Sequence, residues 1–259
     1  MNKYKDGELV IIEVENLSEL AGLDSYYDIC LINNPDKNTL IYPTKITYEI
    51  ELDGTMEDYL KTLNQKRRYN LLRQHKIIEE KIDTHIKEDI NEEDFNNWNT
   101  GYKEFISELP HGDNRVDDSW FDSRGKLHLL VEYRDRLTNE IVGGTLVKKM
   151  KEKMSMSYGW ANKEERRLGI ATHEVFILLD YAISKGYKKL SFGQDNNLYG
   201  GHLSLGLHHF KTYWNTKPKI TVSSEKKGIV FNINSDKSFC FYLLNEDNSL
   251  YLKKINYED

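Results

Sequence analysis

The chain has 259 residues, of which 39% are hydrophobic, and carries a formal net charge of −6. This length and apolar content suffice for one large domain or two small ones. Net acidity argues against indiscriminate nucleic-acid binding, and no apolar run approaches the roughly 20 residues needed to cross a bilayer. The two cysteines, Cys30 and Cys240, form no spaced cluster. We therefore expect no metal site, and reduced thiols in a cytoplasmic protein.

Strand and helix signals alternate along the first hundred residues. Runs rich in β-branched residues predict three strands, which cover 7–14, 28–32 and 45–51. Thr55, with Asp58 three positions later, has the pattern of a capping box and predicts the start of a long helix. A short strand is expected at 83–87, and Asn91 is expected to cap a second helix.

The rest of the chain predicts a sheet with helices around it. A loop rich in Asp, Gly and Ser covers 110–125 and carries Trp120, which is either part of a substrate lid or an anchor for the loop. Three strands joined by hairpin turns should follow, at 127–133, 141–148 and 153–160. A helix is expected after Gly169. Periodicity then predicts a strand, a helix and three C-terminal strands, at 189–193, 203–214, 228–233, 239–244 and 250–255.

The stretch Arg166–Ala171 lies between an expected strand and an expected helix. Main-chain N–H groups in such a turn converge with the positive end of the helix dipole, which favours a phosphate or pyrophosphate group. Gly169 would let the backbone approach that ligand closely. The alternative is an ordinary tight turn with solvated arginines.

The segment Tyr158–Ala171 resembles the acyl-CoA loop of GNAT-fold N-acyltransferases. The pattern of that family is Arg/Gln-x-x-Gly-x-Gly/Ala, and Arg166, Gly169 and Ala171 occupy its three defined positions. The resemblance implies that the loop holds the pyrophosphate of an acyl-CoA donor.

Two further stretches resemble the FemAB-type branch of the same superfamily. Phe192–Asp195, followed by Gly206–Trp214, is similar to its Phe-Gly … Gly-Leu-x-x-Phe-Lys-x-x-Trp/Phe-Gly signature. Leu52–Leu60, followed by Lys66–Arg73, resembles the helix that opens the catalytic half. Together the resemblances cover roughly Tyr48 to Asn215.

The resemblance implies an α/β (α+β) fold with a GNAT-like mixed central sheet flanked by helices. We expect an N-terminal β-rich extension at 1–47, an acyltransferase core at 48–222, and C-terminal strands packed on that core at 223–259. The oligomeric state is open, and a homodimer is one option.

The implied activity is N-acyl transfer, in which an acyl group, expected to be acetyl, moves from acyl-CoA to a primary amine. The acceptor would be a small polar molecule such as an amino sugar, an amino acid or a short peptide, in a bacterial cytoplasm. Charged tRNA and acyl-carrier protein remain open as donors, although net acidity disfavours tRNA. A third alternative is a degenerate acyltransferase fold that serves as a binding module.

The resemblance also implies the residues that bind the donor. The strand end should offer main-chain hydrogen bonds to the pantetheine arm, and the following turn should bind the pyrophosphate. The residues expected in these two roles are Trp160, Ala161, Asn162, Arg166, Arg167, Leu168, Gly169, Ile170, Ala171 and Thr172.

Three residues are candidates for the chemistry. Lys211 matches the lysine that stabilises charge at the reacting carbonyl in FemAB-type enzymes. Tyr213, with Tyr199 beside it as an option, is the candidate acid for the leaving thiolate. Glu132, in the middle of an expected strand, is a candidate base, although a lone strand glutamate more often faces solvent.

The acceptor amine has four candidate partners. Gln194 and Asp195 follow a strand, where an open sheet presents ligands, and His208 and Trp120 are the other two. The basic run at 66–76 is either a contact for a phosphate, a carboxylate or an RNA stem, or a charged helix face paired with Glu79 and Glu80.

Overall fold

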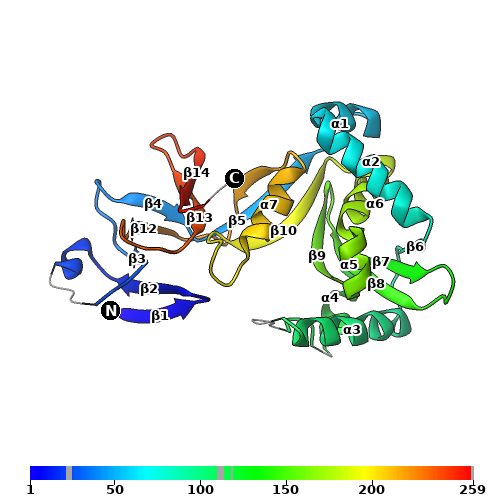
Figure 1. Cartoon of the computed structure of the whole chain (residues 1–259), viewed down its shortest axis with the longest axis horizontal. Coiled ribbons are helices and arrows are strands. Elements are labelled where there is room, and N and C mark those ends of the chain that lie inside the picture. The colour runs from blue at the N-terminus through cyan, green and yellow to red at the C-terminus, as the bar shows by residue number, and fades with distance from the viewer. Residues whose placement is uncertain (22–24, 110–113, 118, 258–259) are drawn as a thin grey trace. The chain divides into compact units, whose positions relative to one another are not determined.

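The computed structural model describes residues 1–21, 25–109, 114–117 and 119–257. The chain divides into two compact units (Figure 1). Unit 1 comprises Met1–Tyr48 and Gln194–Asp259, and unit 2 comprises Glu49–Gly193. Two strands, β5 (Lys45–Glu51) and β10 (Lys189–Asn196), contain the points at which the chain passes from one unit to the other.

Unit 1 is built on a seven-stranded mixed sheet in the order β1-β2-β3-β12-β4-β13-β14. Its strands are β1 (Asn2–Asp6), β2 (Leu9–Val14), β3 (Ile29–Ile32), β4 (Leu40–Pro43), β12 (Lys226–Phe231), β13 (Phe239–Leu244) and β14 (Leu250–Ile255). The unit also contains a short 3-10 helix (Leu17–Leu20), α7 (Leu205–Tyr213) and β11 (Lys217–Ile220). Strand β12 pairs with both β3 and β4, so N-terminal and C-terminal segments share one sheet.

Unit 2 holds most of the second sheet, whose strand order is β11-β5-β10-β9-β8-β7-β6. Its strands are β6 (Ile82–Lys87), β7 (His128–Asp135), β8 (Ile141–Lys149) and β9 (Lys153–Ala161). Its α-helices are α1 (Met56–Thr62), α2 (Gln65–Glu79), α3 (Glu92–Ser107), α4 (Trp120–Arg124), α5 (Lys163–Leu168) and α6 (Ile170–Ser184), and a 3-10 turn covers Gly125–Leu127. Strands β6 to β9 are antiparallel, whereas β9 and β10 run parallel, so the sheet is mixed.

Both predicted helix starts are confirmed. Thr55 and Asp58 form a reciprocal capping box at the start of α1, and Asn91 does the same with Asp94 at the start of α3. The long helix predicted after Thr55 is wrong, because it is two helices. The backbone becomes extended at Leu63, and Asn64 caps α2 by accepting a hydrogen bond from the main chain three residues later.

The division into an extension at 1–47, a core at 48–222 and C-terminal strands stays a prediction. It rests on family resemblance, whereas the two units are defined by compactness and group residues 194–222 with both ends of the chain. Part of the predicted loop, residues 110–113 and 118, lies outside the described residues. In the portion of the chain that the structure describes, no helix is both long and apolar enough to span a membrane.

The core of unit 2 contains a glycine that a larger residue should not replace. A Cβ added at Gly101 in α3 would lie 2.2 Å from the indole of Trp160, whose ring is buried in an aromatic cluster. Gly101→Ala should therefore cost about 1–3 kcal/mol through overpacking, despite the better helix propensity of alanine.

Gly206→Ala in α7 is the matched control, because the nearest atom to the added Cβ is 3.8 Å away. Urea unfolding should show this variant to be as stable as the parent or slightly more so. Equal stability of the two alanine variants would contradict the packing argument.

Candidate active site

Helix α7, the end of β10 and the segment that follows it place polar groups in the interior of unit 1. Gln194 and Asp195 lie within β10, so the prediction that they follow a strand is wrong. Ser204 caps α7, because its hydroxyl accepts a hydrogen bond from the N–H of Leu207 at 3.2 Å. His208 and Lys211 lie three positions apart, hence on one face of the helix, and both are buried. The sequence thus turns one face of a short helix inward with a cation on it.

Lys211 forms an ion pair with Asp195. Its Nζ lies 2.6 Å from Asp195 Oδ2, and the two side chains are only 7% and 9% exposed. Tyr199 donates its hydroxyl hydrogen to the same carboxylate oxygen. Lys211 and Asp195, proposed separately from the sequence, are therefore direct partners, and Tyr199 joins them.

Aromatic rings surround this ion pair. The hydroxyl of Tyr48 lies 3.0 Å from Nδ1 of His208, and the Lys211 ammonium lies 5.7 Å from the centre of the Tyr48 ring. Tyr199 and Tyr242 pack edge-on against Tyr48. We call Tyr48, Asp195, Tyr199, His208, Lys211 and Tyr242 the Lys211 cluster.

Burial sets the protonation states in the Lys211 cluster. Burial lowers the pKa of Lys211, and the Asp195 carboxylate opposes that effect. Burial, with the neighbouring His209 and Lys254 side chains, lowers the pKa of His208 to about 4, so its ring is neutral at pH 7. Burial and Asp195 raise the pKa of Tyr199, which keeps its hydroxyl protonated as a donor.

The backbone beside the cluster is held by Asn197. Its Nδ2 donates to the carbonyl oxygens of Pro43 and Tyr242 at 2.6 and 2.8 Å, and its Oδ1 accepts from the Tyr242 N–H at 2.7 Å. Such a fully satisfied buried amide fixes the segment that carries Asp195 and Tyr199. The sequence analysis did not identify Tyr48, Tyr242 or Asn197 as site residues. Only Asn197 had a sequence signal that could have indicated the site, because it lies just after a strand.

The cluster can supply a positioned positive charge and a hydroxyl donor. Both are useful where negative charge develops on an oxygen or sulfur atom during acyl transfer. It offers no strong base, because the low pKa of His208 makes its ring a poor proton acceptor.

The predicted donor-binding stretch lies on unit 2 and differs from a simple strand-to-helix turn. Helix α5 fills the space between β9 and α6, and Gly169 ends α5 and begins α6. The expectation of a bare turn is therefore wrong. Asn162, Arg166, Arg167 and Ala171 are exposed, whereas Trp160, Ala161 and Ile170 are buried, and Leu168 and Thr172 are half-buried.

Gly169 is required by the fold itself. Its φ is +91°, in the left-handed region that favours glycine. A Cβ there would lie 2.4 Å from the Gln74 amide nitrogen, which donates to the carbonyl of Leu168 at 2.8 Å. A bulky residue at 169 would disturb this junction whether or not a ligand binds, so Gly169→Val is a poor test of donor binding.

Two backbone features remain suited to a donor. The first N–H groups of α6, at Ile170 and Ala171, have no intrahelical partner, while the Gly169 carbonyl accepts from Thr172 and His173. Strand β9 pairs with β10 only from Lys153 to Ser155. Beyond Ser155, that edge of β9 has no strand beside it in the part of unit 2 that the structure describes.

The other predicted site residues contact partners outside the Lys211 cluster. In unit 2, Glu132 is 1% exposed and pairs with Lys87 at 3.0 Å and Arg134 at 2.7 Å. To act as a base, Glu132 would have to release Lys87 or Arg134. Its role as a base stays a prediction. Trp120 stacks on Phe95 with ring centres 5.5 Å apart, as an anchor does.

In unit 1, the exposed Gln194 accepts a hydrogen bond from Ser223 at 3.2 Å. The ring of Tyr213 packs on Trp214. Within the described ranges, no group of three or more His, Cys, Asp or Glu side chains could hold a metal ion.

The sequence matches no family model, and no curated protein matches it. The crystal structure of FemX is similar with a TM-score of 0.54 and 13% identity, over 71% of this chain and 61% of FemX. The structure of L-PGS from Bacillus licheniformis is similar with a TM-score of 0.52 and 12% identity, over 90% of this chain and 81% of L-PGS. A GCN5-related N-acetyltransferase-like protein from Streptococcus suis is similar with a TM-score of 0.37 and 8% identity, over 89% of this chain and 82% of that protein. The fold is thus similar to those of FemX and L-PGS, which bears out the expected GNAT-like fold class, and the chain spans less than two thirds of FemX.

Proposed function

We propose that this protein is an acyltransferase that moves an acyl group, acetyl in the simplest case, from a thioester to the amine of a small polar acceptor. The observation that carries the proposal is the buried ion pair between Lys211 and Asp195 in the Lys211 cluster, on an acyltransferase-like fold. Burying charges costs free energy even when they are paired, and buried ionisable groups with a specific charge partner are frequent at functional sites.

In this proposal Lys211 stabilises the oxyanion that forms when the amine attacks the thioester carbon. Asp195 holds the ammonium in place, and Tyr199 shares that carboxylate, so its hydroxyl is oriented as well. The amine nitrogen loses its proton and the thiolate gains one. The proposed donor of that second proton is Tyr213, because the Tyr199 hydroxyl donates to Asp195 and its raised pKa makes it a poor acid. Glu132 is the candidate for the group that takes the first.

Acyl-CoA is the proposed donor. Its pantetheine arm would use the open edge of β9 near Trp160, Ala161 and Asn162, and its pyrophosphate would lie at Arg166–Thr172. The free first-turn N–H groups of α6 support this assignment. The acceptor is proposed to use Gln194, Asp195 and His208 of unit 1. A role for Trp120 of unit 2 in binding the acceptor stays a prediction, as does a cytoplasmic location.

Charged tRNA is the second candidate donor, and one feature of α2 favours it. Glu79 pairs with His75 rather than with the basic run. Lys66, Arg73 and Lys76 are exposed and have no ion-pair partner among the described residues, and Tyr69 is 64% exposed beside them. Unpaired cations interleaved with an exposed aromatic ring suit a nucleic-acid backbone. Acyl-carrier protein remains the third donor.

Ala171→Asp is the sharper test of the CoA assignment. The exposed position adds a negative charge in the first turn of α6, which suits the helix dipole and should not harm the fold. At low ionic strength it should weaken CoA binding about tenfold or more by repelling the pyrophosphate. Calorimetry with CoA and acetyl-CoA measures this effect.

Asn97→Asp on the exposed face of α3 is the control, since it adds the same charge elsewhere on unit 2. Equal CoA affinity in the two variants would refute the donor site at α6. Thermal shift with CoA, acyl-carrier protein and charged tRNA in parallel separates the donors, and stabilisation by none of them would favour the degenerate binding module.

A further inference from the structure

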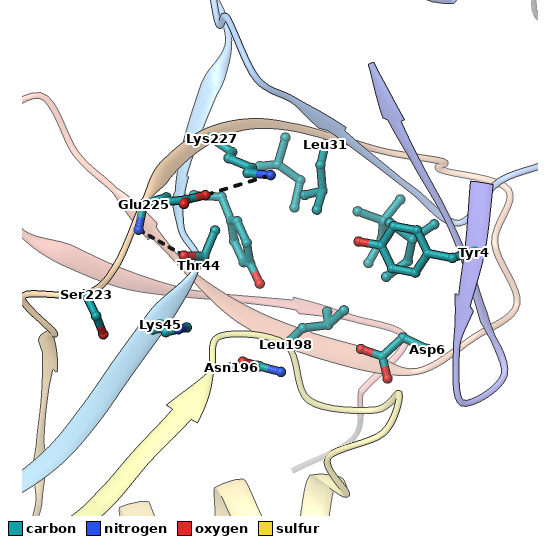
Figure 2. A pocket seen from close by; sticks show the side chains of 14 residues that line it. Tyr4, Asp6, Leu31, Thr44, Lys45, Asn196, Leu198, Ser223, Glu225 and Lys227 are labelled. Carbon is teal, nitrogen blue, oxygen red and sulfur yellow. Dashed lines mark hydrogen bonds and ion pairs between the residues drawn. The ribbon is translucent and has the colours of Figure 1, made fainter. Parts of the chain in front are cut away.

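Unit 1 contains a cavity of about 330 Å³ against its seven-stranded sheet (Figure 2). Its lining includes exposed residues such as Tyr4, Asn196 and Glu225, so it opens to solvent. Small-molecule sites start at roughly 300 Å³, so its volume is of the size that accommodates a small ligand.

The floor of the cavity is apolar. Strands β2, β3, β4 and β12 and the segment after β10 contribute aliphatic side chains and one aromatic ring. These residues are Ile11, Ile29, Leu31, Tyr42, Leu198 and Ile229. Most of them belong to the same buried cluster, so the floor is part of the core of unit 1. Such a surface favours the hydrocarbon part of a ligand.

Charged groups lie at opposite ends of this floor. Figure 2 shows Asp6 with Tyr4 at one end, and Lys45 with Ser223 at the other. Lys227 also lines the cavity, but it is ion-paired with Glu13 and lies 4.0 Å from Glu225, so its charge is balanced.

Asp6 and Lys45 differ from Lys227 in this respect. Neither forms an ion pair with any other residue in the described ranges. Asp6 accepts a hydrogen bond from the main chain of His202 through Oδ1, which leaves Oδ2 for a further donor. A carboxylate and an ammonium without an oppositely charged partner in the described residues, at the two ends of an apolar cavity, leave both charges open to a ligand.

We propose that this cavity binds a linear zwitterion whose ammonium lies at Asp6 and whose carboxylate lies at Lys45, with an apolar body between them. A free α-amino acid carries both charged groups on one carbon, whereas the proposed ligand carries them at opposite ends of its body. Two kinds of molecule have the required chemistry, namely an apolar dipeptide and an ω-amino carboxylic acid.

The proposed site shares a wall with the Lys211 cluster but is separate from it. Along the segment 195–199, Asp195 and Tyr199 belong to the cluster, whereas Asn196 and Leu198 line the cavity. A ligand in the cavity would therefore contact the other side of the segment that holds Asp195. The inference does not depend on the proposed acyl transfer, since it concerns binding alone.

Calorimetry on the full chain tests the proposal with two ligands, leucyl-leucine as the apolar dipeptide and 8-aminooctanoate as the ω-amino carboxylic acid. Leucine is the comparison ligand. At least one of the two should bind, and leucine should bind at least about tenfold more weakly. Acetylating the amine or amidating the carboxylate should each weaken binding by about tenfold or more, because each removes a charge-assisted hydrogen bond.

Lys45→Met and Asp6→Asn should each weaken binding of the free zwitterion to a similar extent. Lys45→Met should not weaken binding of the amidated ligand any further, because that ligand has no carboxylate for Lys45. Lys5→Met removes an exposed lysine of β1 that does not line the cavity, and it should change nothing. Leu31→Trp, at a half-buried position, should fill the cavity and abolish binding in a protein that circular dichroism shows to be folded. The proposal is overturned if neither zwitterion binds at millimolar concentration, if capped ligands bind as well as free ones, or if Lys45→Met behaves like Lys5→Met.

Discussion

Replacing Lys211 with methionine should lower kcat by about 10²–10³ and leave the dissociation constant of the donor nearly unchanged. The ammonium is buried and held at 2.6 Å by Asp195, so it is positioned before the reaction begins. A fixed cation beside a developing oxyanion is worth on the order of 3 kcal/mol in the transition state. An amine panel with detection of the released thiol supplies the assay, and calorimetry supplies the donor affinity.

The same substitution also leaves Asp195 charged, buried and bound only to Tyr199. Removing one partner of a buried ion pair destabilises a protein by about 3–5 kcal/mol, so lost activity alone would not identify a chemical role. The double variant Asp195→Asn/Lys211→Met removes both charges and should recover most of the stability while staying inactive. Lys211→Arg should retain part of the rate, because it keeps the charge.

Two results would remove Lys211 from the reaction. The first is near-normal turnover by Lys211→Met, and the second is activity regained by the double variant together with its stability. In either case Lys211 would have a structural role, and Tyr213 and Tyr199 would be the next candidates. Measuring thermal unfolding beside kcat for each variant separates these cases.

Local signals in the sequence predicted local structure well. Thr55 and Asn91 are caps whose partners lie three residues away, so their patterns are complete within one turn of chain. The break between α1 and α2 was missed although Asn64 carried the same signal, because the apolar spacing of Leu60 and Leu63 suggested a continuous helix. Helix α5 was missed because the resemblance predicted a loop there, although its residues favour helix.

The candidate site could be predicted only in part. Lys211 and Asp195 were found by their motifs, but their ion pair joins residues 16 positions apart on different elements. Tyr48 and His208 are 160 positions apart in the chain, and no periodicity connects them. Whether a strand tyrosine faces a buried cation or an apolar layer depends on tertiary packing, which a single sequence does not specify.

Glu174→Gln should stabilise the protein most at alkaline pH and by less than about 1 kcal/mol near pH 5. Glu174 lies on α6, and its Oε1 is buried with no hydrogen-bond partner in the described part of the chain. Burial raises the pKa of this carboxyl from 4.5 to about 7, and a hydrogen bond with Thr145 offsets only part of that effect. The ionised form is therefore the unfavourable one in the folded state.

The direction of the pH dependence follows from these pKa values. Below pH 4.5 the carboxyl is protonated in both the folded and the unfolded chain, so it costs nothing. Between pH 4.5 and 7 the folded state binds a proton that the unfolded state releases, and stability falls as pH rises. Above pH 7 the charge is buried at a constant cost of about 3 kcal/mol, at roughly 1.4 kcal/mol for each pKa unit.

Urea unfolding at pH 5, 6, 7 and 8 measures the difference between Glu174→Gln and the parent. Tryptophan fluorescence suits unit 2, which holds Trp98, Trp120 and Trp160 of the four tryptophans. The neighbouring His173, whose pKa burial lowers to about 4, titrates in both proteins and cancels in the difference. Exposed Glu164→Gln is the control and should show no pH-dependent gain. A difference that stays constant from pH 5 to 8 would mean that water reaches the Glu174 carboxylate, and that α6 packs less closely on the sheet than described.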